Sequence, residues 1–335
     1  MRDPDRLQEF LELLKEPASG YASGQWLAKK AGISRSAVWK QVQNLRRYGY
    51  VIESLHGRGY RLAAETEYPV PWELGKLLKT SIIGRGVIVY RFSTDSTQSI
   101  ALSLAGKENS DGAVVIAEQQ SSGRGRMKRK WVSPRGGIWL SVVVKPSIPT
   151  AASTMLPFAA AVAVADAIKS ITGLDAALKW PNDVMIGGKK VAGILLDLSA
   201  EAETVNYAVI GIGINVNVET SKIKIDRGEG RPPITSLKEE TGRDVNRLRL
   251  TAALLEKLEH YCRVLEQDPL SIIAKWRTSS GMIGKNVTVM LSQQGKKEIK
   301  GVAADINDDG SLLIRTKEHG DINVISGDVI ILNSC

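Results

Sequence analysis

Cysteine, histidine and phenylalanine are scarce in this chain of 335 residues, which contains two, three and three of them. Two cysteines, Cys262 and Cys335, cannot build a disulfide framework or a cysteine-based metal site. The histidines, His56, His260 and His319, lie far apart in the sequence and make no ligand cluster. These absences exclude the small disulfide-stapled and zinc-ribbon classes and favour a protein of the reducing cytosol.

Long hydrophobic runs are also missing. The longest candidate, residues 156–165, is short and rich in alanine, so we expect no membrane-spanning segment. The first ten residues, MRDPDRLQEF, alternate in charge and lack the apolar stretch of a secretory signal. Apolar residues make up 43% and charged residues 24% of the chain, a mixture typical of a globular protein with a real core. We therefore expect a cytoplasmic protein of two or three domains.

Positive charge is in excess, and it gathers in two places. The net charge is +9. Residues 24–61 contain eight basic side chains against the single acid Glu53, and residues 124–130 contain five basic side chains and no acid. A charge run is usually only a solvated surface. Two separate clusters nevertheless indicate two contacts with polyanions, of which the first would suit DNA and the second nucleotide phosphates.

Residues 1–65 are predicted to form a winged helix-turn-helix domain. Apolar residues between positions 7 and 14 recur at helical spacing, and Ser23 and Ser34 are suitable N-caps for two further helices. Two short strands, 50–54 and 59–62, would then flank the turn of the wing. Small residues between the second and third helices allow the close packing that this motif requires.

The third helix of this domain would enter a major groove, and the wing would reach neighbouring phosphates. The candidate DNA-binding residues are Ser34, Arg35, Ser36, Trp39, Lys40 and, in the wing, Arg58. A small helical domain that binds another protein is the alternative. The eight-to-one ratio of basic to acidic residues favours DNA.

The remaining chain divides into a large middle domain, 66–283, and a short tail, 284–335, after a proline-punctuated linker at 64–71. Strands paired along the sequence and two long helices predict a mixed sheet with helices on one face. The expected strands are 87–92, 113–118, 138–144, 176–180, 191–197 and 207–216, and the expected helices are 152–171 and 247–267. Short strands joined by tight turns in the tail predict a compact barrel of SH3-like size.

Two motifs of the middle domain combine glycine, cations and polar groups. The segment 123–131, Gly-Arg-Gly-Arg-Met-Lys-Arg-Lys-Trp, allows the backbone to fold closely around an anion, although no P-loop pattern follows. A basic surface loop or a second nucleic-acid contact is the alternative. The segment 179–183, Lys-Trp-Pro-Asn-Asp, places polar residues directly after a strand. By composition alone, Asn182 and Asp183 would be read as an ordinary turn.

Two further motifs lie on predicted strands. Lys190 sits just inside an otherwise apolar strand after the Gly187-Gly188 turn, where a cation either snorkels to solvent or faces an anion. Gly211 and Gly213 are two apart, so both lie on one face of a strand without side chains. A ligand pressing against the backbone would require this, and so would a packed helix.

In this order the four motifs resemble one family, the biotin–protein ligases. The resemblance covers nearly the whole chain, including the winged helix and the C-terminal barrel. It implies a central domain like that of class II synthetases. Some of these ligases lack the N-terminal domain, whereas this chain resembles the bifunctional members that also repress transcription.

The resemblance implies a two-step reaction with ATP and Mg²⁺. Biotin and ATP give biotinyl-5′-adenylate, and the biotinyl group then passes to a lysine of a biotin carboxyl carrier domain. Because a carboxylate must attack a negative phosphate, cations should dominate catalysis. The resemblance gives Arg126 and Lys190 as catalytic residues and Asp183 as the candidate Mg²⁺ ligand. The residues implied for the nucleotide are Arg126, Trp131, Asn182, Asp183 and Asn215.

The biotin site follows from the same resemblance. Biotin needs hydrogen-bonding groups at the end of an apolar slot. The implied residues are Ser96, Thr97, Gln120, Gly123, Arg124, Lys190, Gly211 and Gly213. The chain departs from the family at Gln98, where asparagine is usual, and at Met127-Lys128, where a glycine commonly stands. No role is assigned to Gln98, and Arg315 is the candidate contact from the tail.

The same loop could link the two activities. A bound adenylate would order the glycine- and arginine-rich segment. In the family the ordered form is a homodimer, which presents two winged helices to a two-fold operator DNA. Three alternatives remain: a ligase whose winged helix is not regulatory, a ligand-sensing transcription factor without enzymatic activity, and a lipoate or octanoate transferase, which the motifs at 123–131 and 179–183 disfavour.

Overall fold

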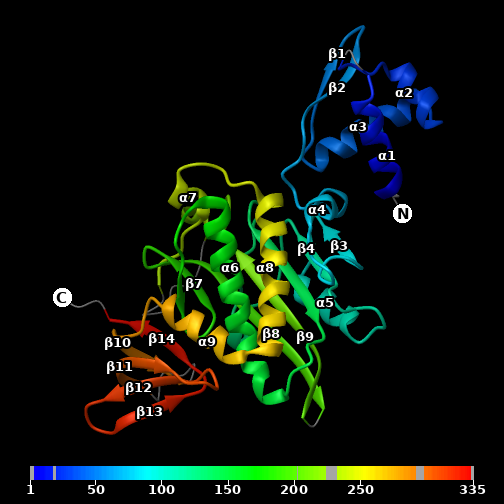
Figure 1. The fold of residues 1–335 in the computed structure, drawn as a ribbon. Coiled ribbons are helices and arrows are strands. Elements are labelled where there is room, and N and C mark those ends of the chain that lie inside the picture. Colours follow the sequence, from blue (N-terminus) through cyan, green and yellow to red (C-terminus); the bar gives the residue numbers. More distant parts are fainter. Residues whose placement is uncertain (1–3, 18–19, 202, 224–231, 292–297, 333–335) are drawn as a thin grey trace. The chain divides into compact units, whose positions relative to one another are not determined.

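The chain folds into two compact units, Met1–Lys76 and Leu77–Cys335. The computed structural model describes residues 4–17, 20–201, 203–223, 232–291 and 298–332 (Figure 1). The predicted architecture, a winged helix followed by a central mixed sheet and a C-terminal barrel-like sheet, is confirmed by the elements below.

The first unit is a winged helix-turn-helix. Its elements are α1 (Pro4–Lys15), α2 (Gly24–Ala31), α3 (Arg35–Arg47), β1 (Val51–Leu55) and β2 (Gly59–Ala64). Ser23 and Ser34 cap α2 and α3 as predicted, each accepting a backbone N–H with its hydroxyl. A buried cluster that includes Leu11, Leu27 and Leu45 holds the three helices together. The strands β1 and β2 pair antiparallel and form the wing.

The segment predicted as a linker packs against the winged helix. The hydroxyl of Thr66 donates to the carbonyl of Tyr48 at 2.5 Å. Helix α4 (Pro71–Leu77) then brings the indole of Trp72 to 2.6 Å from the Tyr50 hydroxyl, which donates to the Glu73 carboxylate at 2.7 Å. Burial raises the pKa of Tyr50, so this hydroxyl remains a donor. These contacts give the first unit a defined C-terminal end.

A seven-stranded mixed sheet forms the centre of the second unit. Its strand order is β3-β4-β5-β9-β8-β7-β6, with β3 and β4 parallel and every other pair antiparallel. The strands are β3 (Ile88–Arg91), β4 (Val114–Ala117), β5 (Ile138–Val144), β6 (Ala177–Lys179), β7 (Asp183–Ile186), β8 (Lys189–Glu201) and β9 (Thr204–Ile214). Strand β7 was not predicted, because its polar start at Asp183 has the composition of a turn.

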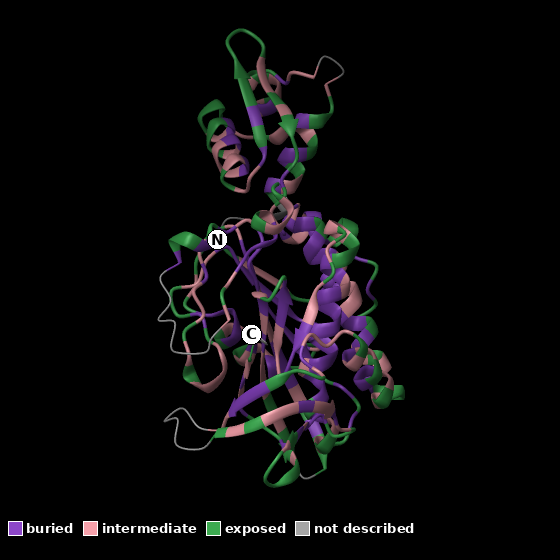
Figure 2. Ribbon diagram, turned by 90° about the vertical axis from the view of Figure 1, so that its left-hand side faces the viewer, coloured by how far each residue is buried: buried purple, intermediate pink, exposed green. Residues whose placement is uncertain are grey.

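Two long helices, α6 (Leu156–Thr172) and α8 (Arg247–Gln267), lie side by side over the sheet (Figure 1). The helical span Thr150–Thr172 is long and apolar enough to cross a membrane by length and composition, but 72% of its apolar window is buried inside the unit. Figure 2 shows the same interior as a continuous buried layer. This span is therefore the core helix of the unit. Its α-helical part begins at Leu156, later than the predicted start at residue 152, because residues 150–155 form a 3₁₀ turn.

Shorter helices complete the unit. They are α5 (Thr97–Ala105), α7 (Leu237–Thr241) and α9 (Pro269–Thr278), with 3₁₀ turns at Arg126–Lys128, Thr150–Met155 and Thr220–Lys222. Helix α5 packs through Ala101 and Ala105 against Val115, Val143 and Val209 of the sheet. Side chains alternate along a strand, so Gly211 and Gly213 lie on the same face as Val209. Helix α5 and these two glycines thus share one face of the sheet.

The C-terminal sheet has five antiparallel strands in the order β13-β12-β11-β10-β14. They are β10 (Asn286–Met290), β11 (Glu298–Ile306), β12 (Leu312–Thr316), β13 (Gly320–Val324) and β14 (Asp328–Ile331). The indole of Trp180 donates to the carbonyl of Gly310 at 3.0 Å, and Arg277 donates to Asp305 at 2.8 Å. These contacts dock the sheet against the central domain, and β10 and β14 become part of the site wall.

Candidate active site

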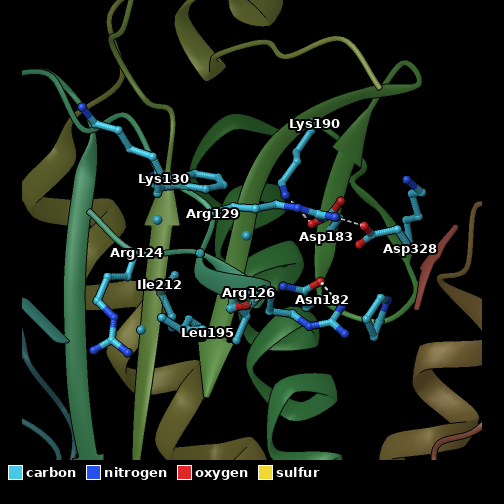
Figure 3. Close-up of a pocket in the computed structure, with 18 of the residues that line it drawn as sticks. Arg124, Arg126, Arg129, Lys130, Asn182, Asp183, Lys190, Leu195, Ile212 and Asp328 are labelled. Atoms are coloured by element: carbon cyan, nitrogen blue, oxygen red, sulfur yellow. Dashed lines mark hydrogen bonds and ion pairs between the residues drawn. The ribbon is translucent and has the colours of Figure 1, made fainter. Parts of the chain in front are cut away.

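A cavity of about 390 Å³ opens on the face of the sheet that carries α5 (Figure 3). Its walls come from the start of α5, the 124–131 loop, strands β5, β8 and β9, the 179–183 segment and the C-terminal strands β10 and β14. Of the predicted biotin and nucleotide residues, those that line it are Ser96, Thr97, Gln120, Arg124, Arg126, Trp131, Asn182, Asp183, Lys190, Gly211 and Gly213. The structure thus brings most of the candidate residues to one cavity.

One end of the cavity is a network of small polar groups at the start of α5. The backbone N–H of Thr97 donates to Gln120 Oε1 at 2.8 Å, and the hydroxyl of Thr97 lies 2.9 Å from that of Ser141. Ser96 Oγ is buried and has no hydrogen-bond partner, a property that it shares with Trp131 Nε1 among the described residues. Both atoms belong to the cavity wall. A buried polar atom without a partner is costly, so both are suited to a ligand.

Gln98, to which the sequence assigned no role, fixes the floor of this end. Its amide donates to Val209 O at 2.9 Å and to Asp197 Oδ2 at 3.0 Å, and its oxygen accepts from Ser141 Oγ at 2.8 Å. A Cβ added to Gly211 would lie 2.5 Å from Gln98 Oε1. Gly211 therefore provides the space that the longer glutamine side chain occupies.

Trp131 covers the other two glycines of the floor. A Cβ on Gly213 would lie 2.6 Å from Trp131 Nε1, and one on Gly193 would lie 2.9 Å from the same ring. The ring also packs edge-on against Trp139. The sequence left two explanations open for these paired glycines, a ligand against the backbone or a packed helix. At Gly211 the packed helix applies, because the approaching side chain is Gln98 of α5, whereas at Gly213 the approaching group is the ring of Trp131.

The 123–131 loop folds back on itself as a small hairpin. Trp131 N donates to Gly123 O, and Gly125 N donates to Arg129 O, each at 2.8 Å. At its tip Met127 and Lys128 have φ values of 53° and 59°, in the left-handed region that favours glycine. The loop therefore makes a left-handed turn without the glycine expected there. Gly123 closes this hairpin and is not part of the cavity wall.

Arg126 follows the second glycine of the loop and enters the cavity. Its Nη1 donates to Asn182 Oδ1 at 3.2 Å, while Asn182 Nδ2 donates to Ile194 O at 2.6 Å. The amide of Asn182 is thereby held with its oxygen toward the guanidinium. Burial lowers the pKa of Arg126, and the carboxylates of Asp328 and Asp183 oppose that effect. A partly desolvated guanidinium binds an anion more strongly than an exposed one.

Lys190 faces an anion, which decides the alternative that the sequence left open. Its ammonium lies 2.5 Å from Asp183 Oδ1 and 5.1 Å from the centre of the Trp131 ring. The pairing of β7 with β8 shifts register between Val184 and Met185, at the level of Lys190. Such a bulge re-aims a side chain at a strand edge.

Four charged residues of the cavity wall were not predicted as site residues: Arg129, Lys130, Lys179 and Asp328. Arg129 pairs with Asp328, the first residue of β14, and the buried Lys179 interacts electrostatically with Asp183 and Asp328. Burial lowers the pKa of Lys179. Six cations and two carboxylates line the cavity, an excess of four positive charges: Arg124, Arg126, Arg129, Lys130, Lys179 and Lys190 against Asp183 and Asp328. A cavity so charged favours a polyanionic ligand.

Besides Gly123, two expected residues lie outside the cavity wall. Asn215 is buried beside the cavity, where Nδ2 donates to Thr235 O at 3.0 Å, so its amide holds the backbone of the neighbouring segment. Arg315 pairs with Asp321 on the exposed face of the C-terminal sheet. The tail does line the cavity, through Met290 of β10 and Asp328, Val329 and Ile330 of β14, and its charged contribution is Asp328, which follows Gly327. A side chain at Gly327 would collide with Met290 and Val289 of β10.

The carboxylates of the cavity suit a metal ion that binds together with substrate phosphates better than one that the protein alone would hold. Among the described residues no group of three or more histidine, cysteine or carboxylate side chains converges. Mg²⁺ usually binds to one or two carboxylates together with substrate phosphates and water. Asp183 and Asp328 are the carboxylates of the cavity wall, and each is paired with a cation.

The predicted DNA-binding residues are all exposed in the first unit. Ser34 Oγ caps α3, and Arg35, Ser36 and Lys40 follow on its open side. Trp39 is 55% exposed, which is unusual for tryptophan in a domain with its own core. Arg58 is exposed at the turn of the wing. The arrangement matches the recognition helix and wing that the sequence predicted.

Comparisons with known proteins agree with this geometry. Residues 90–215 match the biotin/lipoate A/B protein ligase family, residues 6–61 an HTH domain, and residues 282–332 the biotin protein ligase C-terminal domain. The chain is 35% identical over 324 residues to the bifunctional ligase/repressor BirA of Bacillus spizizenii, covering 96% of this chain and 97% of that protein. It is 30% identical to the protein of that name from Escherichia coli, with 97% of each chain covered.

A solved structure extends the similarity to the fold of the second unit. The biotin protein ligase from Aquifex aeolicus, in complex with biotin and ATP, superposes with a TM-score of 0.61 at 28% identity, covering 74% of this chain and 100% of that one. Sequence and domain order therefore agree along almost the entire chain, and the fold agrees over 74% of it. This chain belongs to the biotin–protein ligase family, among its bifunctional ligase/repressor members.

Proposed function

We propose that the cavity of the second unit joins biotin to ATP and then passes the biotinyl group to a lysine of a biotin carboxyl carrier domain. The main observation behind this assignment is that one cavity has a neutral, hydrogen-bonding end and a positively charged end. Small neutral hydrogen-bonding groups surround Ser96 and Thr97, whereas Arg126, Lys179 and Lys190 supply positive charge. Biotin is a neutral ring system with an acid tail, and ATP is a polyanion, so each end suits one substrate.

In the first step an oxygen of the biotin carboxylate attacks the α-phosphorus of ATP. The bond between this phosphorus and the bridging oxygen breaks, and pyrophosphate leaves. Both reacting groups are negative, so their approach must be screened. In this proposal Lys190 lies beside the carboxylate and Arg126 beside the phosphate, where each stabilises charge that develops in the transition state.

In the second step the ε-amine of the carrier lysine attacks the acyl carbon of the adenylate. The bond from this carbon to the phosphate oxygen breaks, AMP leaves, and the amine nitrogen loses one proton. Asn182 keeps Arg126 directed at the phosphate through the 3.2 Å hydrogen bond. Trp131 is proposed to move with the loop, because its ring now covers the glycine floor on which biotin would rest.

Mg²⁺ is proposed to arrive with ATP. When bound, it would neutralise phosphate charge and favour the departure of pyrophosphate. Asp183 is the residue proposed to hold it, and Lys190 would then be released from its ion pair to act on biotin.

The test is incubation of the full chain with biotin, Mg·ATP and a purified carrier fragment, with the mass of the fragment as the readout. One biotinyl group should be added, and omission of ATP should abolish the addition. An unmodified carrier fragment, together with no biotin-dependent release of pyrophosphate, would refute the assignment of the cavity.

The first unit is proposed to bind operator DNA when the adenylate is present. In this proposal the adenylate-bound chain is a homodimer, two winged helices meet a two-fold site, and the protein works in the cytoplasm. Removal of residues 1–65 should abolish the binding of DNA selected from a random pool by the full chain. Retention of a sequence-specific gel shift by the truncated chain would contradict the DNA role, while the ligase assay reports separately on the second unit.

A further inference from the structure

The 123–131 loop is held at both of its ends by carboxylates from outside it. At the near end Arg124 lies 3.8 Å from Asp197 of β8, which also accepts from Gln98. At the far end Arg129 pairs with Asp328 of β14, in the C-terminal sheet. In Figure 3 the side chain of Arg129 points across the cavity to Asp328, while Arg124 lies on the opposite side. The two anchors therefore serve opposite ends of the cavity.

The tip of the loop depends on the far anchor. Met127 and Lys128 are held in the left-handed region, which is unfavourable for residues with a Cβ. Arg129 follows them directly, and its ion pair is about two-thirds removed from solvent, with 31% and 33% of the two side chains exposed. Arg126 precedes them and accepts the N–H of Arg129 with its carbonyl at 3.1 Å. Fixing Arg129 thus fixes the backbone that carries Arg126.

We propose that Asp328 is a positioning residue for adenylation, which clamps Arg129 and so holds Arg126 over the nucleotide end of the cavity. In this proposal the C-terminal sheet contributes to adenylation, because it supplies Asp328. The electrostatics support the pairing: Arg129 and Arg126 hold the pKa of Asp328 below its usual range, against the opposing effect of burial. This inference rests on the proposed adenylation site and adds to it a residue that does not touch the reacting atoms.

A competing role predicts the opposite sign. Asp328 is one of only two carboxylates in the described wall of a cationic cavity, so it also competes with phosphate for Arg129. If that competition dominated, removal of the charge would improve ATP binding. If the clamp dominates, removal of the charge frees the tip of the loop, and ATP binding weakens because ATP must then order that tip. The left-handed tip favours the clamp, because such a turn persists only where its surroundings hold it.

The experiment compares Asp328→Asn with Asp321→Asn. Asp321 forms an ion pair with Arg315 in the same sheet, at 2.9 Å and away from the cavity, so it is a matched control. The readouts are the KM for ATP and kcat of biotin-dependent pyrophosphate release, the Kd for biotin without nucleotide, and the thermal midpoint. Loss of a charge-assisted hydrogen bond of this kind should lower kcat/KM for ATP about tenfold or more. Biotin affinity should change less than about twofold, because the Asp197 anchor is intact.

Two further variants separate positioning from structure. Asp328→Glu should restore most of the activity, and Arg129→Met should reproduce the loss. The double variant should be no worse than the more impaired single variant, since both remove one interaction. If Asp328→Asn fails to fold, Arg129→Met carries the test, because it leaves the C-terminal sheet untouched.

Three results would overturn the inference: ATP kinetics like those of Asp321→Asn, a lower KM for ATP in Asp328→Asn, or losses that multiply in the double variant. Absence of biotin-dependent pyrophosphate release from the unmodified chain is a different failure, because it removes the proposed adenylation site and this inference together.

Discussion

Replacement of Gly211 by alanine tests the floor of the cavity with a single methyl group. In a strand, a glycine-to-alanine change that meets no obstacle stabilises a protein by about 0.5–1 kcal/mol. Here the new Cβ would lie 2.5 Å from Gln98 Oε1 and 3.3 Å from Gln98 Cδ, so the side chain must move. Stabilisation would therefore show that the new methyl group meets no obstacle, and destabilisation would show that it displaces Gln98.

The magnitude follows from what Gln98 would give up. It forms hydrogen bonds to Ser141 at 2.8 Å, to Val209 at 2.9 Å and to the carboxylate of Asp197 at 3.0 Å. At about 1 kcal/mol for each neutral bond and somewhat more for the charged one, their loss would cost about 3 kcal/mol. For a domain of this size that corresponds to a fall in Tm of about 6–12 °C.

The assay is scanning calorimetry, with biotin titration on the same samples. Gly213→Ala is the matched control: its Cβ would lie 2.6 Å from Trp131 Nε1, but that indole has no hydrogen bond to lose. We expect less than about 1 kcal/mol of destabilisation there, together with a change in tryptophan fluorescence as the ring leaves the floor. A Gly211→Ala chain as stable as the unmodified protein, with unchanged biotin affinity, would refute the role assigned to Gln98.

Three other predictions concern separate parts of the chain. Arg126→Ala should lower the rate of biotin-dependent pyrophosphate release by about 100-fold while the Tm stays within 2 °C, and an unchanged rate would defeat its catalytic assignment. Trp39→Ala should leave the Tm unchanged, since the side chain is 55% exposed, but weaken specific DNA binding about tenfold in a gel shift; equal affinity would remove Trp39 from the interface. Glu259 accepts backbone N–H groups of residues 81–83, which holds its pKa below the usual range. Its stabilisation is therefore present above the ordinary glutamate pKa of 4.5 and lost as the pH falls through the lowered pKa, so the Tm of Glu259→Gln should fall less between about pH 5 and 3 than that of the unmodified chain. Parallel acid limbs in calorimetry would contradict that role.

The sequence predicted the features that depend on local pattern. Serine caps before apolar stripes placed α2 and α3, and strand β5 and helix α8 have the predicted bounds because each is bounded by strong local signals. Glycine pairs indicated the floor of the cavity. Each of these features depends on residues that are neighbours in the sequence, so a single sequence is enough to predict it.

What the sequence did not predict depends on contacts between distant segments. Nothing near Asp328 indicates that it meets Arg129, since one belongs to β14 and the other to a loop in the central domain. The charge of Lys179 interacts with the carboxylates of Asp183 and Asp328, and the second of these comes from the C-terminal sheet. Asn215 was predicted to contact the nucleotide because of its place in the motif, but its side-chain amide donates to the backbone carbonyl of Thr235. Strand β7 was missed because it is only four residues long and begins at the turn-like Asp183, and its pairing with β6 and β8 is visible only in the fold.

The position of β14 bears on how the protein matures during synthesis. This strand is the last in the described chain, and it brings Asp328, Val329 and Ile330 to a cavity whose walls, apart from Met290 of β10, come from earlier segments of the central domain. A ribosome-bound chain can therefore fold its DNA-binding unit and most of its sheet while the basic loop still lacks its far partner. Competence to activate the vitamin would appear only once β14 has been synthesised, so a product terminated before Asp328 would retain a DNA-binding surface without a finished enzyme.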